Sequence, residues 1–106
     1  MHETLCQNVK GYIDENVAHR GYGSFRGWCF HEQHNICPLR AKLTDEIIIN
    51  NVKIELRKDV GSFYKNDMFD LAGWSFNVSN PGDYELQMYF DKEWHTVFRL
   101  KYEEKS

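Results

Sequence analysis

Two cysteines and two histidines fall within residues 29–37, at Cys29, His31, His34 and Cys37. Thiolates and imidazoles are the ligand set of structural zinc sites, so these four side chains are candidate metal ligands. Their spacing differs from the closely paired cysteines of familiar zinc sites, and the segment has the form of a hairpin with residues 31–35 at its tip. We therefore expect no metal, and we expect Cys29 and Cys37 to be buried neighbours, because free cysteine is commonly buried. A cross-strand disulfide is the alternative under oxidising conditions.

Arg57 and Asp59 form a second polar pair, at the end of a predicted strand. The R-x-D spacing puts both side chains on the outward side of that strand, where the chain leaves it. An Asp at the start of a loop usually accepts backbone N–H groups of the turn that follows. We expect a structural corner in which the Asp59 carboxylate faces the amides between Val60 and Phe63, and in which Arg57 crosses to a neighbouring strand or loop. The alternative is that both residues line a ligand-binding corner.

No arrangement in the sequence predicts catalysis. A G-x-S-x-G elbow is missing, and no spacing places a base beside a nucleophile. Glycoside hydrolysis needs two acids that face each other in a cleft, whereas most acids here occupy outward strand positions or turns. Gly21 and Gly23 are not followed by the lysine and helix of a phosphate-binding loop. We expect a protein that is not an enzyme, with no catalytic residues and no cofactor.

Aromatic residues make up 15% of the chain and are the remaining candidates for binding. Sugar-binding surfaces use exposed aromatic faces with a few polar groups that orient the ligand. Tyr12 and Tyr89 have outward parity in predicted strands, and Tyr64 lies in an irregular loop, so these three are candidate carbohydrate-binding residues. Trp28 fits either face of its strand. The aromatic residues with inward parity are predicted to pack in the core: Trp74, Phe76, Tyr84, Phe90, Trp94 and Phe98.

Apolar and polar residues alternate along most of the chain. This period of two indicates strands that have one face in a core and the other in water. Many short strands separated by turn residues predict an all-β fold, an antiparallel β-sandwich of about seven or eight strands. The predicted strands include residues 24–30 and the alternating runs 9–14, 39–43, 52–57, 74–78, 84–90 and 94–101.

Two segments between these runs carry their own predictions. Asn50-Asn51 predicts a two-residue hairpin between strands at 47–49 and 52–57, because Asn tolerates the positive φ of tight turns. Ile54 and Leu56 have core parity in the second of these strands. Residues 61–70 have no clear period and fit a helical turn at 62–65.

Length and charge restrict the class of protein. A chain of 106 residues predicts a single β-sandwich domain, residues 1–106, which can bury a core without a disulfide or a metal. The net charge of −3 argues against a nucleic-acid partner, which requires clustered Lys and Arg. No apolar run approaches the roughly 20 residues of a membrane-spanning helix, so no membrane partner is expected. Three cysteines, an odd number, and an N-terminus without a secretory signal predict a cytoplasmic or otherwise intracellular protein.

Six short motifs occur in an order that resembles a family of small domains. The family comprises the non-catalytic β-sandwich modules attached to glycosyltransferases and other carbohydrate-active proteins in bacteria and large DNA viruses. The resemblance covers nearly the whole chain, although Trp74 stands where that pattern has Phe, and Phe76 follows with the same parity. The motifs are V-K-G-Y-I-D at 9–14, G-W-C-F at 27–30, P-L-R-A at 38–41, R-K-D-V at 57–60, G-W-S-F at 73–76 and P-G-D-Y-E-L at 81–86.

The resemblance implies an immunoglobulin-like fold and a role as an accessory module without catalytic residues. Its partner would be a glycan or a catalytic glycosyltransferase domain. Two alternatives belong to other classes. One is a protein-interaction domain that pairs through an exposed edge strand. The other is a small zinc-binding domain built on the hairpin between Cys29 and Cys37.

Overall fold

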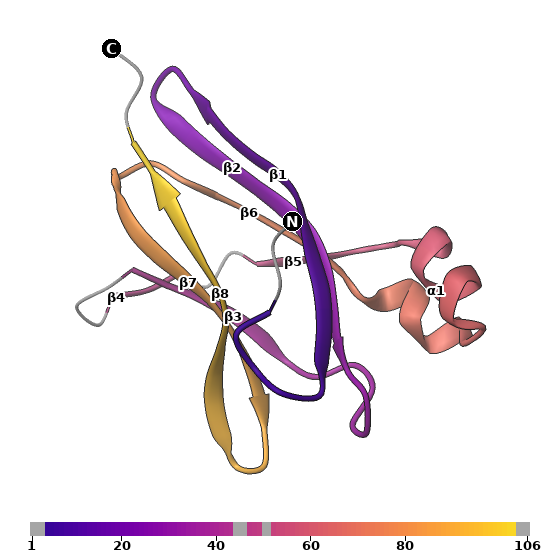
Figure 1. The fold of residues 1–106 in the computed structure, drawn as a ribbon. Helices are drawn as coiled ribbons and strands as arrows, with labels where there is room; N and C mark the ends of the chain where they lie inside the picture. Colours follow the sequence, from indigo (N-terminus) through magenta and orange to yellow (C-terminus); the bar gives the residue numbers. More distant parts are fainter. Residues whose placement is uncertain (1–3, 44–46, 50–51, 104–106) are drawn as a thin grey trace.

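The computed structural model describes residues 4–43, 47–49 and 52–103, with side chains described in the first and last of these ranges. Eight strands in these ranges form two four-stranded antiparallel sheets that pack face to face (Figure 1). The predicted antiparallel β-sandwich is therefore confirmed. Sheet one has the order β1 (Val9–His19), β2 (Tyr22–His31), β6 (Gly73–Val78), β5 (Lys53–Glu55). Sheet two has the order β4 (Ile47–Ile49), β3 (Leu39–Leu43), β7 (Gly82–Phe90), β8 (Glu93–Tyr102).

The main core lies between the sheets and is built from alternate residues of the central strands. Phe25 on β2 pairs with Phe76 on β6, and Leu86 on β7 pairs with both Ala41 on β3 and Phe98 on β8. Trp74 is completely buried among them. Burying a large apolar side chain stabilises a fold by roughly 1.5–3 kcal/mol. The inward parity predicted for most of the aromatic residues is thus confirmed.

Trp94 is an exception, because a β-bulge reverses the parity of β8. Leu86 pairs with Phe98, but the next residue of β7, Gln87, pairs with Thr96, so that Val97 is an extra residue on β8. The Trp94 side chain therefore lies on the outer face of sheet two, where its ring packs against Tyr89 and beneath the Arg40 guanidinium. The prediction that Trp94 is a core residue is wrong. A bulge of one residue moves every side chain beyond it to the opposite face.

The chain crosses between the sheets at two points where the sequence predicts hairpins. His31 and Asn35 form a single antiparallel bridge, but the chain then continues from β2 in sheet one to β3 in sheet two. The predicted hairpin with Cys29 and Cys37 on its arms is therefore wrong in its pairing. The second predicted turn, Asn50-Asn51, lies outside the described residues, and its flanking strands β4 and β5 belong to different sheets.

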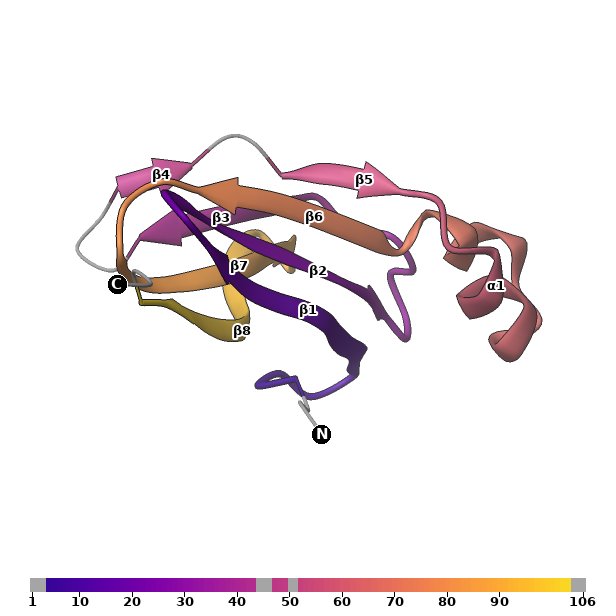
Figure 2. The same ribbon diagram turned by 90° about the horizontal axis from the view of Figure 1, so that it is seen from above.

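Strand β5 is short and forms an edge of sheet one (Figure 2). Ile54 is 53% exposed and Leu56, just beyond the strand, is 62% exposed. The alternation predicts that both side chains are buried in the core, and this prediction is wrong. Ile54 pairs with the buried Trp74, but a side chain at the edge of a sandwich has neighbours on one side alone.

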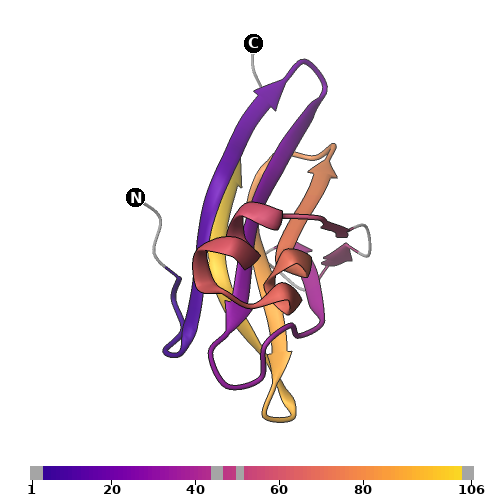
Figure 3. The same cartoon turned by 90° about the vertical axis from the view of Figure 1, so that its right-hand side faces the viewer.

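Two short helical segments follow β5: α1 (Lys58–Tyr64) and the 3-10 helix η1 (Asp67–Leu71). They lie at one end of the sandwich, in front of the strands in Figure 3. Their buried residues Val60 and Phe69 form a second, smaller core with Phe30 and Ala72. Since Phe30 is on the outer side of β2, this strand is covered on both faces here. The helix begins four residues earlier than the predicted turn at 62–65, and neither helical segment is long and apolar enough to span a membrane.

The connection between β6 and β7 is fixed by a tyrosine. Tyr84 is buried near the start of β7, and its hydroxyl donates a hydrogen bond to the carbonyl oxygen of Asn80. The phenol ring of Tyr84 packs between the sheets, with its centroid 6.2 Å from that of the Phe25 ring. The hydrogen bond, which spans four residues, therefore ties the turn to the core.

Candidate functional site

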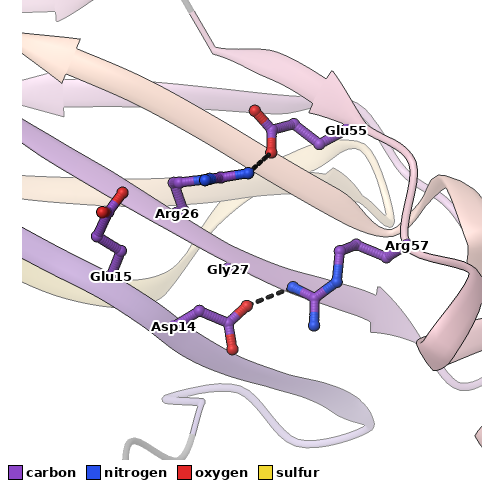
Figure 4. Close-up of a pocket in the computed structure, with 6 residues that line it drawn as sticks. All are labelled: Asp14, Glu15, Arg26, Gly27, Glu55 and Arg57. Atoms are coloured by element: carbon purple, nitrogen blue, oxygen red, sulfur yellow. Dashed lines mark hydrogen bonds and ion pairs between the residues drawn. The ribbon is translucent and has the colours of Figure 1, made fainter.

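A pocket of about 350 Å³ opens on the outer face of sheet one (Figure 4). We call it the charged pocket; it is lined by Asp14, Glu15, Arg26, Gly27, Glu55 and Arg57. Figure 4 shows the polar side chains arranged around Gly27.

A β-bulge puts two consecutive acids into this pocket. Ile13 pairs with Gly27 and Glu15 pairs with Arg26, so that Asp14 is the extra residue on β1. In a regular strand, neighbouring side chains point to opposite faces. The bulge instead turns both Asp14 and Glu15 to the outer face, and bulges often re-aim side chains in this way beside functional sites.

Arg57 links the first helix to β1 across the charged pocket. Its Nε and Nη2 donate hydrogen bonds to the two carboxylate oxygens of Asp59, at 2.9 and 2.8 Å, and Nη1 donates to Asp14. Arg57 thus crosses to another strand, as predicted, but that strand is β1 at the opposite edge of sheet one and not a neighbour of β5. The hydrogen bonds from Arg57 lower the pKa of Asp59, and those same bonds raise the pKa of Arg57.

The predicted backbone partners of Asp59 are secondary. The amides of Val60 and Gly61 donate to the carbonyl oxygen of Arg57, at 3.1 and 3.3 Å. The hydrogen bonds from backbone N–H groups lower the pKa of Asp59 less than those from Arg57. The expectation that Asp59 serves chiefly to accept loop amides is therefore corrected: the residue enters a helix, where the first amides bond to carbonyl groups and the carboxylate is left for Arg57.

A second ion pair forms the opposite wall of the charged pocket. Arg26 Nη2 lies 2.7 Å from Glu55 Oε1, and the Ser75 hydroxyl donates to Glu55 Oε2 at 2.8 Å. The hydrogen bonds from Arg26 and then Ser75 lower the pKa of Glu55, so this carboxylate is ionised at neutral pH. Glu55 therefore has a hydrogen-bond partner at each carboxylate oxygen before any ligand arrives, whereas the Arg26 side chain is 55% exposed.

A second, more apolar pocket of about 410 Å³ adjoins the first. We call it the aromatic pocket; it is lined by Trp28, Asp59, Val60, Phe63 and Tyr64. The two pockets share a border, because Trp28 follows Gly27 on β2 and Asp59 is bonded to Arg57. Phe63 is 79% exposed, whereas Trp28 and Tyr64 are half-buried.

The structure brings together two of the three tyrosines predicted to bind carbohydrate. Tyr12 on β1 is the pairing partner of Trp28 on β2, and the Trp28 and Tyr64 rings are 5.9 Å apart. Tyr12 and Tyr64 therefore flank the same tryptophan on the outer side of sheet one. Tyr89 lies on the outer face of sheet two, beside Trp94, and does not belong to this site.

The four candidate zinc ligands do not converge. His31 is 3% exposed, and its Nδ1 accepts N–H groups of Gln33 and His34 at 3.0 and 3.1 Å. The His34 ring contacts a different residue, with its Nε2 3.1 Å from Oδ1 of Asp91. Within the described part of the chain, no group of three or more His, Cys, Asp or Glu residues has the arrangement of a metal site.

Cys29 and Cys37 are buried in the main core, as predicted, and neither is in a disulfide. Burial raises the pKa of both thiols. Since the thiolate is the nucleophilic form of cysteine, these residues are poor nucleophiles in the folded protein.

No family model matches the sequence, and no curated protein or solved structure matches it significantly. The resemblance to glycosyltransferase-associated modules therefore depends on the ordered motifs of the chain itself.

Several residues of the site have no signal in the sequence. Asp14 and Glu55 look like ordinary outward positions, Glu15 follows the alternating run 9–14, and Arg26 lies on a strand that fits either face. They meet because β1, β2 and β5 contribute to one surface. Phe63 has one weak signal in the sequence: it is an aromatic residue in a segment without the period of a strand, where an aromatic side chain can be exposed.

Proposed function

We propose that this protein is a non-catalytic accessory module that binds a glycan across the charged pocket and the aromatic pocket. The observation that carries the proposal is the aromatic pocket beside a group of fixed polar side chains. Ligand sites are typically concave and largely apolar, with a few polar groups that set orientation. A sugar ring has the same division, because its C–H groups pack on aromatic rings and its hydroxyls form hydrogen bonds.

The polar groups still have capacity for a ligand. A guanidinium has five N–H donors, and Arg57 uses three of them in hydrogen bonds to Asp59 and Asp14. The paired carboxylates retain free lone pairs that accept from hydroxyl groups. Arg57 is the most constrained of these polar side chains, because it bonds to two carboxylates and its side chain is 24% exposed, so it loses less side-chain entropy when a ligand binds.

The strand order supports an immunoglobulin-like type of sandwich. Constant-type immunoglobulin domains have strands ABED in one sheet and CFG in the other. If β4 is named C′ and the other strands are lettered A to G in chain order, sheet one has the order A-B-E-D and sheet two the order C′-C-F-G. The hydrogen bond from Tyr84 to Asn80 corresponds to the tyrosine corner of those domains, which lies at the start of strand F.

A protein-interaction domain is the second candidate. Ile54 and Leu56 are exposed beside the edge strand β5, and exposed edge strands are sites at which another chain can add to a sheet. In the accessory role, the partner at this edge would be a catalytic glycosyltransferase domain.

Phe63→Ala tests the glycan site with little risk to the fold, because this side chain is mostly exposed. The variant and the wild-type protein are titrated with a panel of soluble oligosaccharides by isothermal calorimetry. We expect the best wild-type ligand to lose roughly tenfold or more in affinity, about 1.4 kcal/mol, with an unchanged melting temperature.

Tyr89→Ala is the matched control, since Tyr89 is also an exposed aromatic residue of a sheet surface. We expect the Tyr89→Ala variant to bind the same oligosaccharide with the affinity of the wild-type protein. If Tyr89→Ala abolishes binding while Phe63→Ala does not, the binding site is on sheet two. If no oligosaccharide of the panel binds, the glycan proposal fails.

A further inference from the structure

The aromatic pocket combines three aromatic rings with a carboxylate. Trp28, Phe63 and Tyr64 line it together with Asp59. The Trp28 and Phe63 rings stand at 60° and 77° to the ring of Tyr64, with centroids 5.9 and 4.9 Å from it. The Tyr64 ring is therefore steeply inclined to each of the other two, and the three rings do not form a single flat platform.

Rings arranged in this way are suited to a positive charge. The face of an aromatic ring attracts a cation within about 6 Å of its centroid, and quaternary ammonium groups are typically bound in cages of such rings. A flat sugar ring needs one aromatic face, whereas a rounded ammonium group can contact several inclined faces at once.

The charge around the two pockets has the matching sign. Their lining residues include four carboxylates (Asp14, Glu15, Glu55 and Asp59) and two guanidinium groups (Arg26 and Arg57), a formal charge of −2. Both guanidinium groups already face carboxylates. Hydrogen bonds lower the pKa of Asp59 and of Glu55, which keeps these two carboxylates ionised at neutral pH. An anionic sugar would therefore meet net repulsion at this surface, and a cationic group net attraction.

We propose that the aromatic pocket binds an ammonium group carried by the glycan, namely the protonated amine of an amino sugar. In this arrangement, the Trp28, Phe63 and Tyr64 rings contact the ammonium group, and Asp59 supplies the negative charge next to it. The sugar ring that carries the amine extends into the charged pocket, where its hydroxyls meet the ion-paired side chains. This inference depends on the proposed glycan site and specifies its ligand.

A pair of oligosaccharides that differ in the amine alone tests the inference. Glucosamine oligomers carry protonated amines, and N-acetylglucosamine oligomers of the same length carry neutral amides. Both are titrated into the full chain, with choline as a third ligand that has the ammonium group and no sugar. We expect the glucosamine oligomer to bind about tenfold more tightly than its acetylated counterpart, because the faces of aromatic rings attract a cation and not a neutral amide.

The three ligands separate this inference from the proposed function. Equal affinity for the two oligomers overturns the ammonium site and leaves glycan binding intact. Binding of choline without binding of either oligomer supports an ammonium pocket but overturns the glycan proposal, and points to a methylated amine of another molecule. Tighter binding of the acetylated oligomer also overturns the ammonium site.

Substitutions at Phe63 distinguish a cation–ring contact from ordinary apolar contact. Phe63→Leu keeps an apolar side chain but removes the ring, and Phe63→Trp provides the ring that attracts cations most strongly. We expect the preference for glucosamine oligomers to fall several-fold in the leucine variant and to persist or rise in the tryptophan variant. An equal preference in both variants would overturn the proposed contact.

Asp59→Asn removes the charge at nearly constant shape. We expect the preference for the amine to decrease several-fold, with the acetylated oligomer binding as it does to the wild type. Asp67→Asn is the matched control, because Asp67 is an exposed carboxylate of the adjacent η1 that does not line the aromatic pocket. Retention of the full preference in Asp59→Asn would rule out a role for this charge.

Discussion

His31 shows how one buried side chain makes the fold sensitive to pH. Its Nδ1 accepts two backbone N–H groups, which requires the neutral ring, and burial followed by the charge of His34 lowers its pKa. Asp91 and Glu32 act in the opposite direction, more weakly. The unfolded chain therefore binds the proton more readily than the folded protein does.

We expect the unfolding free energy to fall as the pH decreases from about 6.5, the ordinary pKa of histidine, through the lower folded-state value. His31→Asn retains an acceptor near the position of Nδ1 but does not titrate. In urea titrations at several pH values, this variant should depend less on pH than the wild type does. His19→Asn, at the far hairpin between β1 and β2, is the control and should keep the wild-type slope.

Asp59 makes a smaller contribution to stability than the sequence suggests. If it accepted several loop amides, its loss would cost about 1.5–3 kcal/mol. Its main partner is instead Arg57, and the Asp59 side chain is 66% exposed. We expect Asp59→Ala to lower the unfolding free energy by about 0.2–1 kcal/mol, as for exposed ion pairs. Urea denaturation measures this loss, and a loss near about 3 kcal/mol would indicate that Asp59 stabilises the protein chiefly by accepting backbone N–H groups.

The packing of β2 against β1 and β6 depends on Gly27. A Cβ atom at this position would lie 2.3 Å from the carbonyl oxygen of Tyr12 and 2.7 Å from a ring carbon of Trp74. Neither neighbour has room to move, because one is strand backbone and the other is completely buried. Gly27 thus lets the strand that carries Trp28 lie close to both of its neighbours.

We expect Gly27→Ala to destabilise the protein by about 1–3 kcal/mol through overpacking. The displacement of β2 should also weaken ligand binding, because Arg26 and Trp28 flank the substituted residue. Thermal unfolding and calorimetry on the same variant measure both effects. Ser24→Ala, at a half-buried outer position of the same strand, should stay within about 0.5 kcal/mol of the wild type. Wild-type stability in Gly27→Ala would contradict the close packing.

At the scale of the whole molecule, β5 is one of four edge strands, with β1, β4 and β8, and it is the edge beside the exposed Ile54 and Leu56. It has three residues, and a stable interface usually buries about 1,200–2,000 Å². We therefore expect a monomer in light scattering coupled to size-exclusion chromatography, and we expect the Leu56→Glu variant to have the same molar mass as the wild type. A dimer that Leu56→Glu dissociates would instead favour the protein-interaction domain.

The sequence by itself determined most of the strands, the main core and the outward position of Arg57. These features follow from alternation and from residue type, which are local properties of the chain. Trp74 and Tyr84 were placed correctly because nothing interrupts their strands. Trp94 was misplaced because the bulge at Val97 depends on the pairing of β7 with β8.

Only the tertiary structure decided the composition of the site. Asp14 and Glu15 face one pocket because of a bulge in β1, and Glu55 reaches the same pocket because β5 joins sheet one and not the sheet of β4. Trp28 becomes a half-buried wall of the aromatic pocket because α1 folds back over the outer face of β2. Strand pairing and sheet order arise from contacts between distant residues, and the alternation within a single strand carries no record of its neighbours.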